Sequence, residues 1–394
     1  MIFGLHKEKI GEMCMERYNE TNNQEGKRAE EDLFFKEQKD KLYEILDLAI
    51  RAKASDIHLT NNLVPTIRLD GTLRGLSKFA KNTSDVLASF VVALLNEDQQ
   101  IQYEKEKEID LSISHGPVRF RVHIYRQSES DAIALRIIPS KIPSFNEMNI
   151  PSVLKDFTKF KNGLVLITGI TGSGKSTTLA AIIDEINRTQ SKNIITVEDP
   201  IEFIHSHNKS IVNQREVGVD VQSFSRAVRA AMREDPDILL VGELRDLETI
   251  QNAITMAETG HLVFGTLHTK SVSETVDRII DVFPPAQQEQ IRVQLSNSIA
   301  GIVCQDLLPK VGGGRVPSCE IMITNPAIRS LIKEGGNASA FTDDMFANHR
   351  EMGTQTKLQA IAKLVRNNLI TDETAYRNVK EDEIEMLQKI VASM

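Results

Sequence analysis

Tryptophan is absent from this 394-residue sequence, and cysteine occurs only three times, at Cys14, Cys304 and Cys319. No two of these cysteines form a CxxC pair. A disulfide framework or a cysteine-based zinc site is therefore not expected. Cys304 and Cys319 lie in apolar segments, which indicates that they are small core residues.

Long apolar runs are missing as well. No run reaches the roughly 18 residues that a membrane-spanning helix needs, and the N-terminal MIFGLHKEKIGEMCMERYNE lacks the apolar core of a signal peptide. We therefore expect a cytoplasmic protein whose contact with a membrane is peripheral. The formal net charge of −8 also argues against a basic nucleic-acid-binding surface, so no direct nucleic-acid partner is expected.

The length predicts two domains, because 394 residues exceed one ordinary core. An amphipathic helix, a hairpin signal at Asp70-Gly71 and the alternating VRFRVHIYRQ predict a small domain with a largely antiparallel sheet. Later, GLVLIT, NIITVE, DILLVGE and HLVFGTLH alternate with helical stretches, which is typical of a parallel sheet with helices on both faces. The expected parts are a charged extension (1–40), a first domain (41–139), a linker (140–151), a second domain (152–325) and a helical C-terminal region (326–394).

A glycine-rich loop, Gly169 to Ser176, matches G-x-x-x-x-G-K-[ST] between a buried strand and a helix. Glycines let successive N–H groups point at phosphate oxygens, and the helix adds its positive dipole end. Lys175 is expected to reach the β- and γ-phosphates, Ser176 to bind Mg²⁺ and Thr177 to lie near the α-phosphate. The predicted ligand is a nucleoside triphosphate with Mg²⁺. The expected binding residues are Gly169, Thr171, Gly172, Ser173, Gly174, Lys175, Ser176 and Thr177.

Carboxylates follow two of the predicted strands and are candidates for the chemistry of hydrolysis. Glu243 ends DILLVGE and is the first candidate for the catalytic base. Glu198 ends NIITVE at the sheet edge where ligands collect, and is assigned to metal or water positioning, with Glu202 a weaker candidate. The sequence leaves open whether Glu198 and Glu243 exchange these roles.

Two histidines, His261 and His268, stand at opposite ends of one predicted strand in TGHLVFGTLHT. His268, at the carboxyl end, is the stronger candidate for sensing the γ-phosphate. His261 is a second candidate for contacting phosphate or the attacking water, although a histidine at a strand start also suits a purely structural role.

Together, the loop, EDPIEF, LLVGELRD and TGHLVFGTLHT resemble the secretion ATPase superfamily, which powers type II and type IV secretion and type IV pili. Its Walker A, Asp box, Walker B and His box would map to Gly169–Thr177, Glu198–Phe203, Ile238–Arg245 and Thr259–Thr269. The resemblance implies an α/β fold with a RecA-like P-loop NTPase core, a smaller PAS-like α/β N-terminal domain and a helical C-terminal region. It also implies ATP and Mg²⁺ as the ligands.

Two features narrow the resemblance to the pilus retraction ATPases. The four-cysteine zinc knuckle usual in extension and type II secretion ATPases is missing, and PAIRSLIKE resembles the AIRNLIRE signature of the retraction enzymes. The corresponding residues are Ala327, Ile328, Arg329, Leu331 and Ile332. Ile170, Ser330 and Lys333 depart from the usual proline, asparagine and arginine. An ordinary packed helix, capped by Gly335, would show the same apolar spacing.

Family members are hexameric rings in which a neighbour's first domain completes the nucleotide site. The resemblance therefore assigns Arg121 and Arg136 to the γ-phosphate, where arginine fingers are worth about 10³–10⁵ in rate. It implies a homohexamer that works on an inner-membrane pilus platform protein, peripherally at the cytoplasmic face of the membrane. Domain rotation about the 140–151 linker would transmit the work.

Two alternatives remain open from the sequence. One is a pilus-extension, type II or type IV secretion ATPase. The other is an adaptor that binds ATP and docks partners without turnover.

Overall fold

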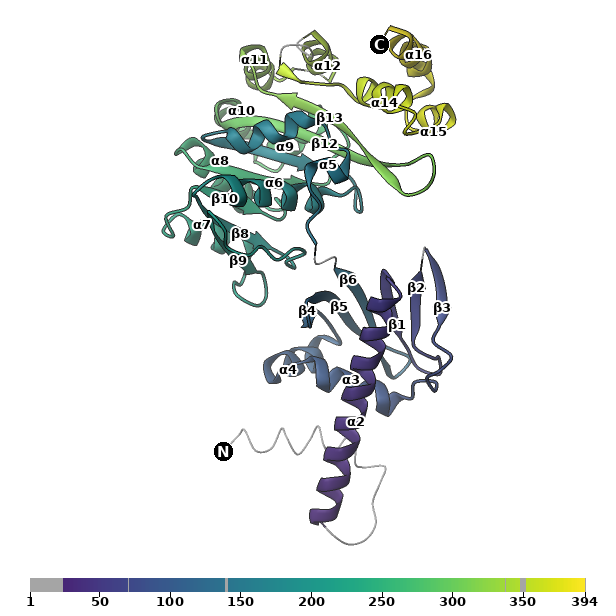
Figure 1. Cartoon of the computed structure of the whole chain (residues 1–394). Helices are drawn as coiled ribbons and strands as arrows, with labels where there is room; N and C mark the ends of the chain where they lie inside the picture. The colour runs from purple at the N-terminus through teal and green to yellow at the C-terminus, as the bar shows by residue number, and fades with distance from the viewer. Residues whose placement is uncertain (1–23, 70, 139–140, 337, 348–351, 394) are drawn as a thin grey trace. The chain divides into compact units, whose positions relative to one another are not determined.

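The computed structural model describes residues 24–69, 71–138, 141–336, 338–347 and 352–393. The chain divides into two compact units, Met1–Ser140 and Lys141–Met394, each with its own sheet and apolar core (Figure 1). Among the described helices, none is both long enough and apolar enough to cross a membrane.

The first unit is built on a six-stranded antiparallel sheet with the order β3-β2-β1-β6-β5-β4. Its strands are β1 Asp56–Leu59, β2 Thr66–Leu69, β3 Thr72–Gly75, β4 Glu108–His115, β5 Val118–Gln127 and β6 Ser130–Ile138, and its helices are α2 Gln24–Arg51, α3 Ser84–Leu94 and α4 Glu97–Glu106. The alternation expected for β5 is present, since Phe120, Val122 and Ile124 are fully buried while Arg121 is exposed. The buried face packs against apolar residues of α2 and α3.

Helix α2 crosses the boundary expected between residues 40 and 41. It runs from Gln24 to Arg51, so the described part of the charged extension is continuous with the first unit. Leu42 and Ile45 are fully buried in the core, whereas Leu33 is 66% exposed. Once its C-terminal turns are anchored, the helix extends outward because strong helix formers follow one another there. Residues 1–23 of the extension lie outside the described residues.

The hairpin expected at Asp70-Gly71 connects β2 and β3, which pair with Leu69 opposite Thr72. Asp70 lies outside the described residues. Gly71 has φ +83°, a left-handed conformation that glycine adopts without steric cost.

The second unit contains a seven-stranded sheet with the order β13-β12-β7-β11-β10-β8-β9. Its strands are β7 Gly163–Thr168, β8 Asn193–Glu198, β9 Ile211–Glu216, β10 Ile238–Val241, β11 Leu262–Leu267, β12 Ile299–Pro309 and β13 Arg315–Ile323. All neighbours are parallel except β12 and β13, which form an antiparallel hairpin at one edge.

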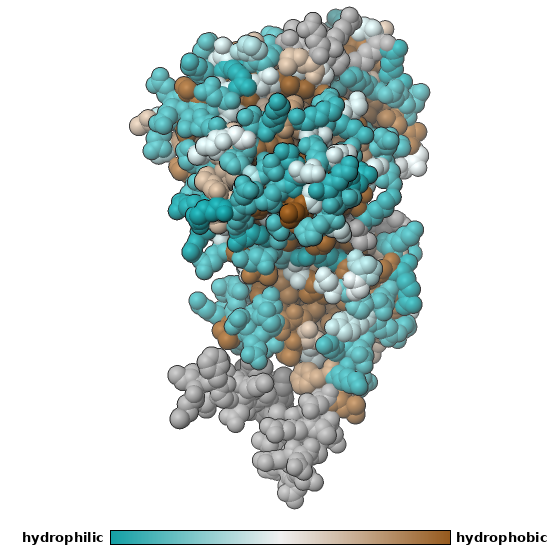
Figure 2. Space-filling view, turned by 60° about the vertical axis from the view of Figure 1, so that its left-hand side comes forward, coloured by the Kyte–Doolittle hydropathy of each residue, from teal (hydrophilic) through white to brown (hydrophobic). Residues whose placement is uncertain are grey.

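Both faces of this sheet are covered, as the continuous apolar strands predict. Leu164 and Leu166 of β7 face a core shared with α7 Phe224–Ala231, α8 Leu247–Glu258, α9 Val272–Asp281 and α10 Pro285–Ser298. Val165 and Ile167 face the opposite core, which includes α5 Phe145–Met148, the 3-10 helix η1 Ser152–Lys159 and α6 Lys175–Thr189. In the face of this unit that Figure 2 presents, the surface is mainly hydrophilic.

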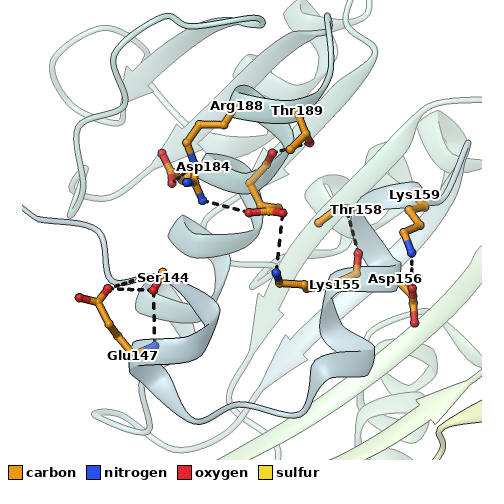
Figure 3. Close-up of polar contacts among 10 residues, drawn as sticks. Ser144, Glu147, Lys155, Asp156, Thr158, Lys159, Asp184, Arg188 and Thr189 are labelled. Atoms are coloured by element: carbon orange, nitrogen blue, oxygen red, sulfur yellow. Dashed lines mark hydrogen bonds and ion pairs between the residues drawn. The ribbon is translucent and has the colours of Figure 1, made fainter.

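The stretch expected to be a linker is largely packed onto the second unit. Ser144 and Glu147 form a capping box on α5 (Figure 3). Phe145 and Ile150 are buried in the same apolar core as residues of α6. Lys155 of η1 also approaches Glu185 of α6 at 4.0 Å. Residues 141–151 therefore belong structurally to the second unit, and Ser140 lies outside the described residues. The sequence showed no periodicity here because the helix is only one turn long.

Beyond β13 the described chain is mainly helical, as expected. The elements are α11 Pro326–Glu334, α12 Ala338–Ala347, α14 Lys357–Arg366, α15 Asp372–Tyr376, the 3-10 helix η2 Glu381–Glu383 and α16 Ile384–Ser393. Helices α11 and α12 add to the core with α8 to α10, whereas α14 and α16 pack with Leu308 and Val316 of the β12–β13 hairpin.

Candidate nucleotide site

The glycine loop, residues 169–174, joins the carboxyl end of β7 to the first residue of α6. Gly169 has φ +141° and Gly174 has φ +89°. A Cβ at Gly169 would lie 2.2 Å from the Gln305 carbonyl oxygen, and one at Gly174 would lie 2.8 Å from the Gln305 side-chain nitrogen. Only glycine fits these positions, so the loop forms a tight backbone cradle.

Lys175 folds back over this cradle. Its Nζ donates to the carbonyl oxygens of Gly169 at 2.8 Å and Ile170 at 3.1 Å. Burial lowers the pKa of Lys175, while the negative charges of Glu243 and Glu202 oppose that shift. The ammonium group therefore already lies among loop carbonyls and the two carboxylates from neighbouring strand ends.

Glu243 lies two residues beyond β10 and is half-buried. Its Oε1 accepts from Arg245 Nε at 2.6 Å and lies 3.4 Å from His268 Nε2. Burial raises the pKa of Glu243, but the hydrogen bond and charge of Arg245, together with His268, outweigh burial and hold the pKa below its usual range. Glu243 is therefore ionised at neutral pH.

Glu198 occupies the last position of the adjacent strand β8. Its Oε1 accepts from Thr196 Oγ1 at 2.7 Å and from Gln214 Nε2 at 3.2 Å. Burial raises the pKa of Glu198, and these hydrogen bonds oppose the shift only partly. A Cβ at Gly242 would lie 3.2 Å from the Glu198 Cα, so the glycine before Glu243 lets the two strand ends approach closely.

The two histidines have different surroundings. His268 follows β11 at the same sheet edge as the glycine loop and contacts Glu243. His261 precedes β11, beside Gly163 at the start of β7, and its Nδ1 lies 3.0 Å from the Met256 carbonyl oxygen. Six residues of strand separate the two histidines, about 20 Å. Within this unit His261 therefore lies at the opposite end of β11 from the glycine loop, and its contact with phosphate or the attacking water stays a prediction.

Arg121 and Arg136 lie on the first unit, directly opposite each other on β5 and β6. Arg136 Nε donates to Asp56 at 2.9 Å, and Arg121 Nε lies 4.0 Å from Asp110. The side chain of Arg136 is 68% exposed and that of Arg121 is 44% exposed. Asp56 and Asp110 partly balance this pair of like charges, which would be unfavourable without a nearby anion.

Helix α11 carries the PAIRSLIKE segment and is capped at both ends. The Asn325 side chain accepts from the Ile328 N–H, and Gly335 ends the helix in the left-handed conformation, as expected. Ile328 and Ile332 are fully buried, but Ala327 is exposed, so Ala327 does not belong to the expected apolar stripe.

Arg329 ties α11 to the end of α10, where its guanidinium donates to the Ser296 and Asn297 carbonyl oxygens.

Arg245 and Gln305 are neighbours of the site that sequence reasoning missed. Arg245 belongs to LLVGELRD, but only the folded loop shows that it contacts Glu243. Gln305 is an uncharged amide that, with Asp306, interrupts the apolar residues of IVCQDLL, and this interruption was the available signal.

Comparisons with known proteins identify the family of this chain. The family model for type II/IV secretion system proteins matches residues 35–389. The chain belongs to this family. It is a P-loop ATPase of the secretion ATPase superfamily, with the α/β fold and the N-terminal and C-terminal regions that the resemblance implied.

Relatives within the family are similar along most of the chain. A type IV pilus retraction ATPase, PilT, from Pseudomonas aeruginosa is 45% identical over 338 residues, covering 86% of this chain and 97% of PilT. A twitching motility protein from Neisseria gonorrhoeae is 44% identical over 321 residues, covering 81% and 85%. A crystal structure of the pilus retraction motor PilT with bound ADP aligns with a TM-score of 0.81 at 45% identity, covering 87% and 98%.

Proposed function

We propose that this ATPase forms a homohexamer whose ATP hydrolysis drives type IV pilus retraction. The observation that carries the proposal is the 45% identity to PilT over 97% of the length of PilT. The match includes both units and α11, and therefore extends beyond the nucleotide loop that all P-loop proteins share.

ATP phosphates would enter the cradle and accept hydrogen bonds from loop N–H groups. Lys175 would exchange its two carbonyl partners for phosphate oxygens. The buried Ser173 Oγ has no hydrogen-bond partner among the described residues, which leaves one more polar group available in the loop.

Mg²⁺ fits the donor set only together with the nucleotide. Among the described residues, no group of three or more His, Cys, Asp or Glu side chains could hold a metal ion. Ser176 and Glu198 would hold it alongside phosphate oxygens, as in other P-loop proteins. When bound, the ion neutralises charge on the phosphates.

Glu243 would accept a proton from the attacking water, since it is ionised and beside the loop. The contact with Arg245 Nε at 2.6 Å would keep this carboxylate ionised. His268, in contact with Glu243, would orient the water or the γ-phosphate. Arg121 and Arg136 would come from the neighbouring subunit and stabilise the charge that develops on the phosphoryl group.

The work would be delivered to a platform protein of the pilus machinery at the cytoplasmic face of the inner membrane. Helix α11 is the candidate coupling element, because its exposed side is separate from the residues that bind nucleotide.

Deletion of the gene tests the direction of the motor. A strain without a retraction ATPase should keep surface pili and lose twitching, since assembly continues. Loss of all surface pili would instead assign the chain to pilus extension. Complementation with the unaltered gene should restore twitching and controls for effects on neighbouring genes.

A further inference from the structure

Gln305 is a polar residue that follows the apolar Ile302, Val303 and Cys304 in β12, and it is only 3% exposed. Its side-chain Nε2 donates to the Ser173 carbonyl oxygen at 2.7 Å, and its Oε1 accepts from Thr178 Oγ1 at 2.8 Å. Ser173 lies in the glycine loop and Thr178 in the first turn of α6. One amide therefore connects both sides of the loop-to-helix junction.

The glycine loop and Gln305 are also packed closely against each other. The loop backbone at Gly169 and Gly174 approaches residue 305 so tightly that a Cβ at either position would clash with it. At Gly172, by contrast, a Cβ would meet nothing within 4 Å. The loop thus rests on Gln305 and is open at Gly172.

Only an amide satisfies both partners. The Ser173 carbonyl oxygen needs a donor, and the Thr178 hydroxyl needs an acceptor. An ionised carboxylate of the same shape has only acceptor oxygens, so one of them would face the Ser173 carbonyl oxygen without a hydrogen between them. Because all three groups are buried, each lost partner leaves an unsatisfied polar atom.

We propose that Gln305 is a positioning residue that holds the loop N–H groups in the arrangement that binds the nucleotide phosphates. This role rests on the nucleotide binding proposed above. It concerns the affinity for the nucleotide and does not depend on hydrolysis or on pilus retraction. The two side-chain hydrogen bonds of Gln305 go to the loop and to α6.

Gln355 provides a matched control. It is also 3% exposed, and its Nε2 donates at 2.7 Å to the carbonyl oxygen of Cys319, the residue opposite Gln305 on β13. Both amides thus make an equally short, buried bond to a backbone carbonyl, but that of Gln355 does not involve the glycine loop.

The test measures Kd for a fluorescent ADP analogue and Tm for purified full-length variants. Gln305→Met and Gln305→Glu should weaken ADP binding by about 10-fold or more, the equivalent of one buried hydrogen bond to the loop. Gln355→Met should lower Tm comparably while leaving Kd within about twofold. In steady-state hydrolysis, KM should rise more than kcat falls for Gln305→Met.

Thr178 offers a second pair of variants that keeps the proposal testable if Gln305 variants do not fold. Thr178→Val removes the hydroxyl at constant shape and should weaken ADP binding, whereas Thr178→Ser keeps the hydroxyl and should bind as the unaltered protein does.

Unchanged ADP affinity in Gln305→Met and Thr178→Val, or an equal loss of affinity in Gln355→Met, would overturn the positioning role. If the unaltered protein binds ADP but does not hydrolyse ATP, the proposed function fails while the affinities still decide the role of Gln305. If it binds no ADP, both proposals fail.

Discussion

At the scale of single residues, the proposed chemistry depends on how Glu243 is held. Arg245 and His268 contact the same carboxylate oxygen, and together they keep its pKa low despite partial burial. A low pKa keeps the base ionised but also weakens it. Arg245 therefore increases the ionised fraction of Glu243 and at the same time lowers its basicity.

Replacement of Arg245 by Gln should shift the acidic limb of the pH–rate profile toward higher pH. Activity requires ionised Glu243 and is lost as pH falls through its pKa, and Arg245 lowers that pKa. Single-turnover hydrolysis between about pH 4 and 8 would measure the shift. Arg229 is nearly as exposed as Arg245 and pairs with Glu248 between α7 and α8, so Arg229→Gln should leave the profile unchanged. An acidic limb unmoved by Arg245→Gln would mean that Arg245 does not act on the base.

At the scale of elements, the β12–β13 hairpin supports several parts of the site. Gln305 lies under the glycine loop, while Glu320 Oε2 accepts from the Val272 N–H at the start of α9, just after the His268 loop. Burial raises the pKa of Glu320 to about 7, and the Val272 hydrogen bond opposes this shift only partly. The hairpin continues directly into α11.

Glu320→Gln should raise the stability of the protein, relative to the unaltered protein, more at pH 8 than at pH 5. A carboxyl whose folded pKa is raised binds more protons when folded, so stability falls as pH rises from about 4.5 to 7 and stays low above that. The shift corresponds to about 3 kcal/mol, and we expect less because Glu320 keeps some solvent exposure. Thermal unfolding at both pH values measures it, and an equal Tm change at pH 5 and pH 8 would contradict the raised pKa.

The exposed side of α11 should be needed for retraction more than for hydrolysis. Ala327→Glu adds charge at an exposed position, so fold and basal ATPase activity should remain within about twofold while twitching is lost. Ala286→Glu is a matched control, since Ala286 is also exposed and also follows the proline that begins its helix. Twitching that survives Ala327→Glu would argue against α11 as the coupling element.

Local spacing predicted most of the second unit because a glycine loop, apolar strands and strand-end carboxylates are encoded by adjacent residues. The sequence could not predict contacts between distant segments. Gln305 of β12 reaches the glycine loop only in the folded chain. Arg245 is two residues from Glu243, but the spacing alone does not show that the loop turns its side chain onto that carboxylate. The short α5 within residues 141–151 was missed because one helical turn has no periodicity.

At the scale of the whole molecule, the proposal requires subunits to share a site. Arg121 and Arg136 lie on one unit, and the glycine loop, Glu243 and His268 lie on the other. In a ring, each arginine pair would serve the nucleotide of the adjacent subunit, as the resemblance implies.

Mixing two inactive variants tests this sharing. Glu243→Gln and Arg136→Gln subunits should each be nearly inactive alone, and mixed rings should recover part of the ATPase activity, because some interfaces combine an intact Glu243 with an intact Arg136. Phosphate release after subunit exchange measures the recovery. No recovery in rings proven to be mixed would place both residues in one subunit's own site.

The central claim is that this protein uses Glu243 to hydrolyse ATP, and phosphate release by the purified protein tests it most directly. The unaltered protein should release phosphate, while Glu243→Gln should bind ATP normally and release phosphate about 10²–10⁴-fold more slowly, as expected for loss of a general base. Equal rates for the two proteins, or no release from the unaltered protein assembled as a hexamer, would contradict the account.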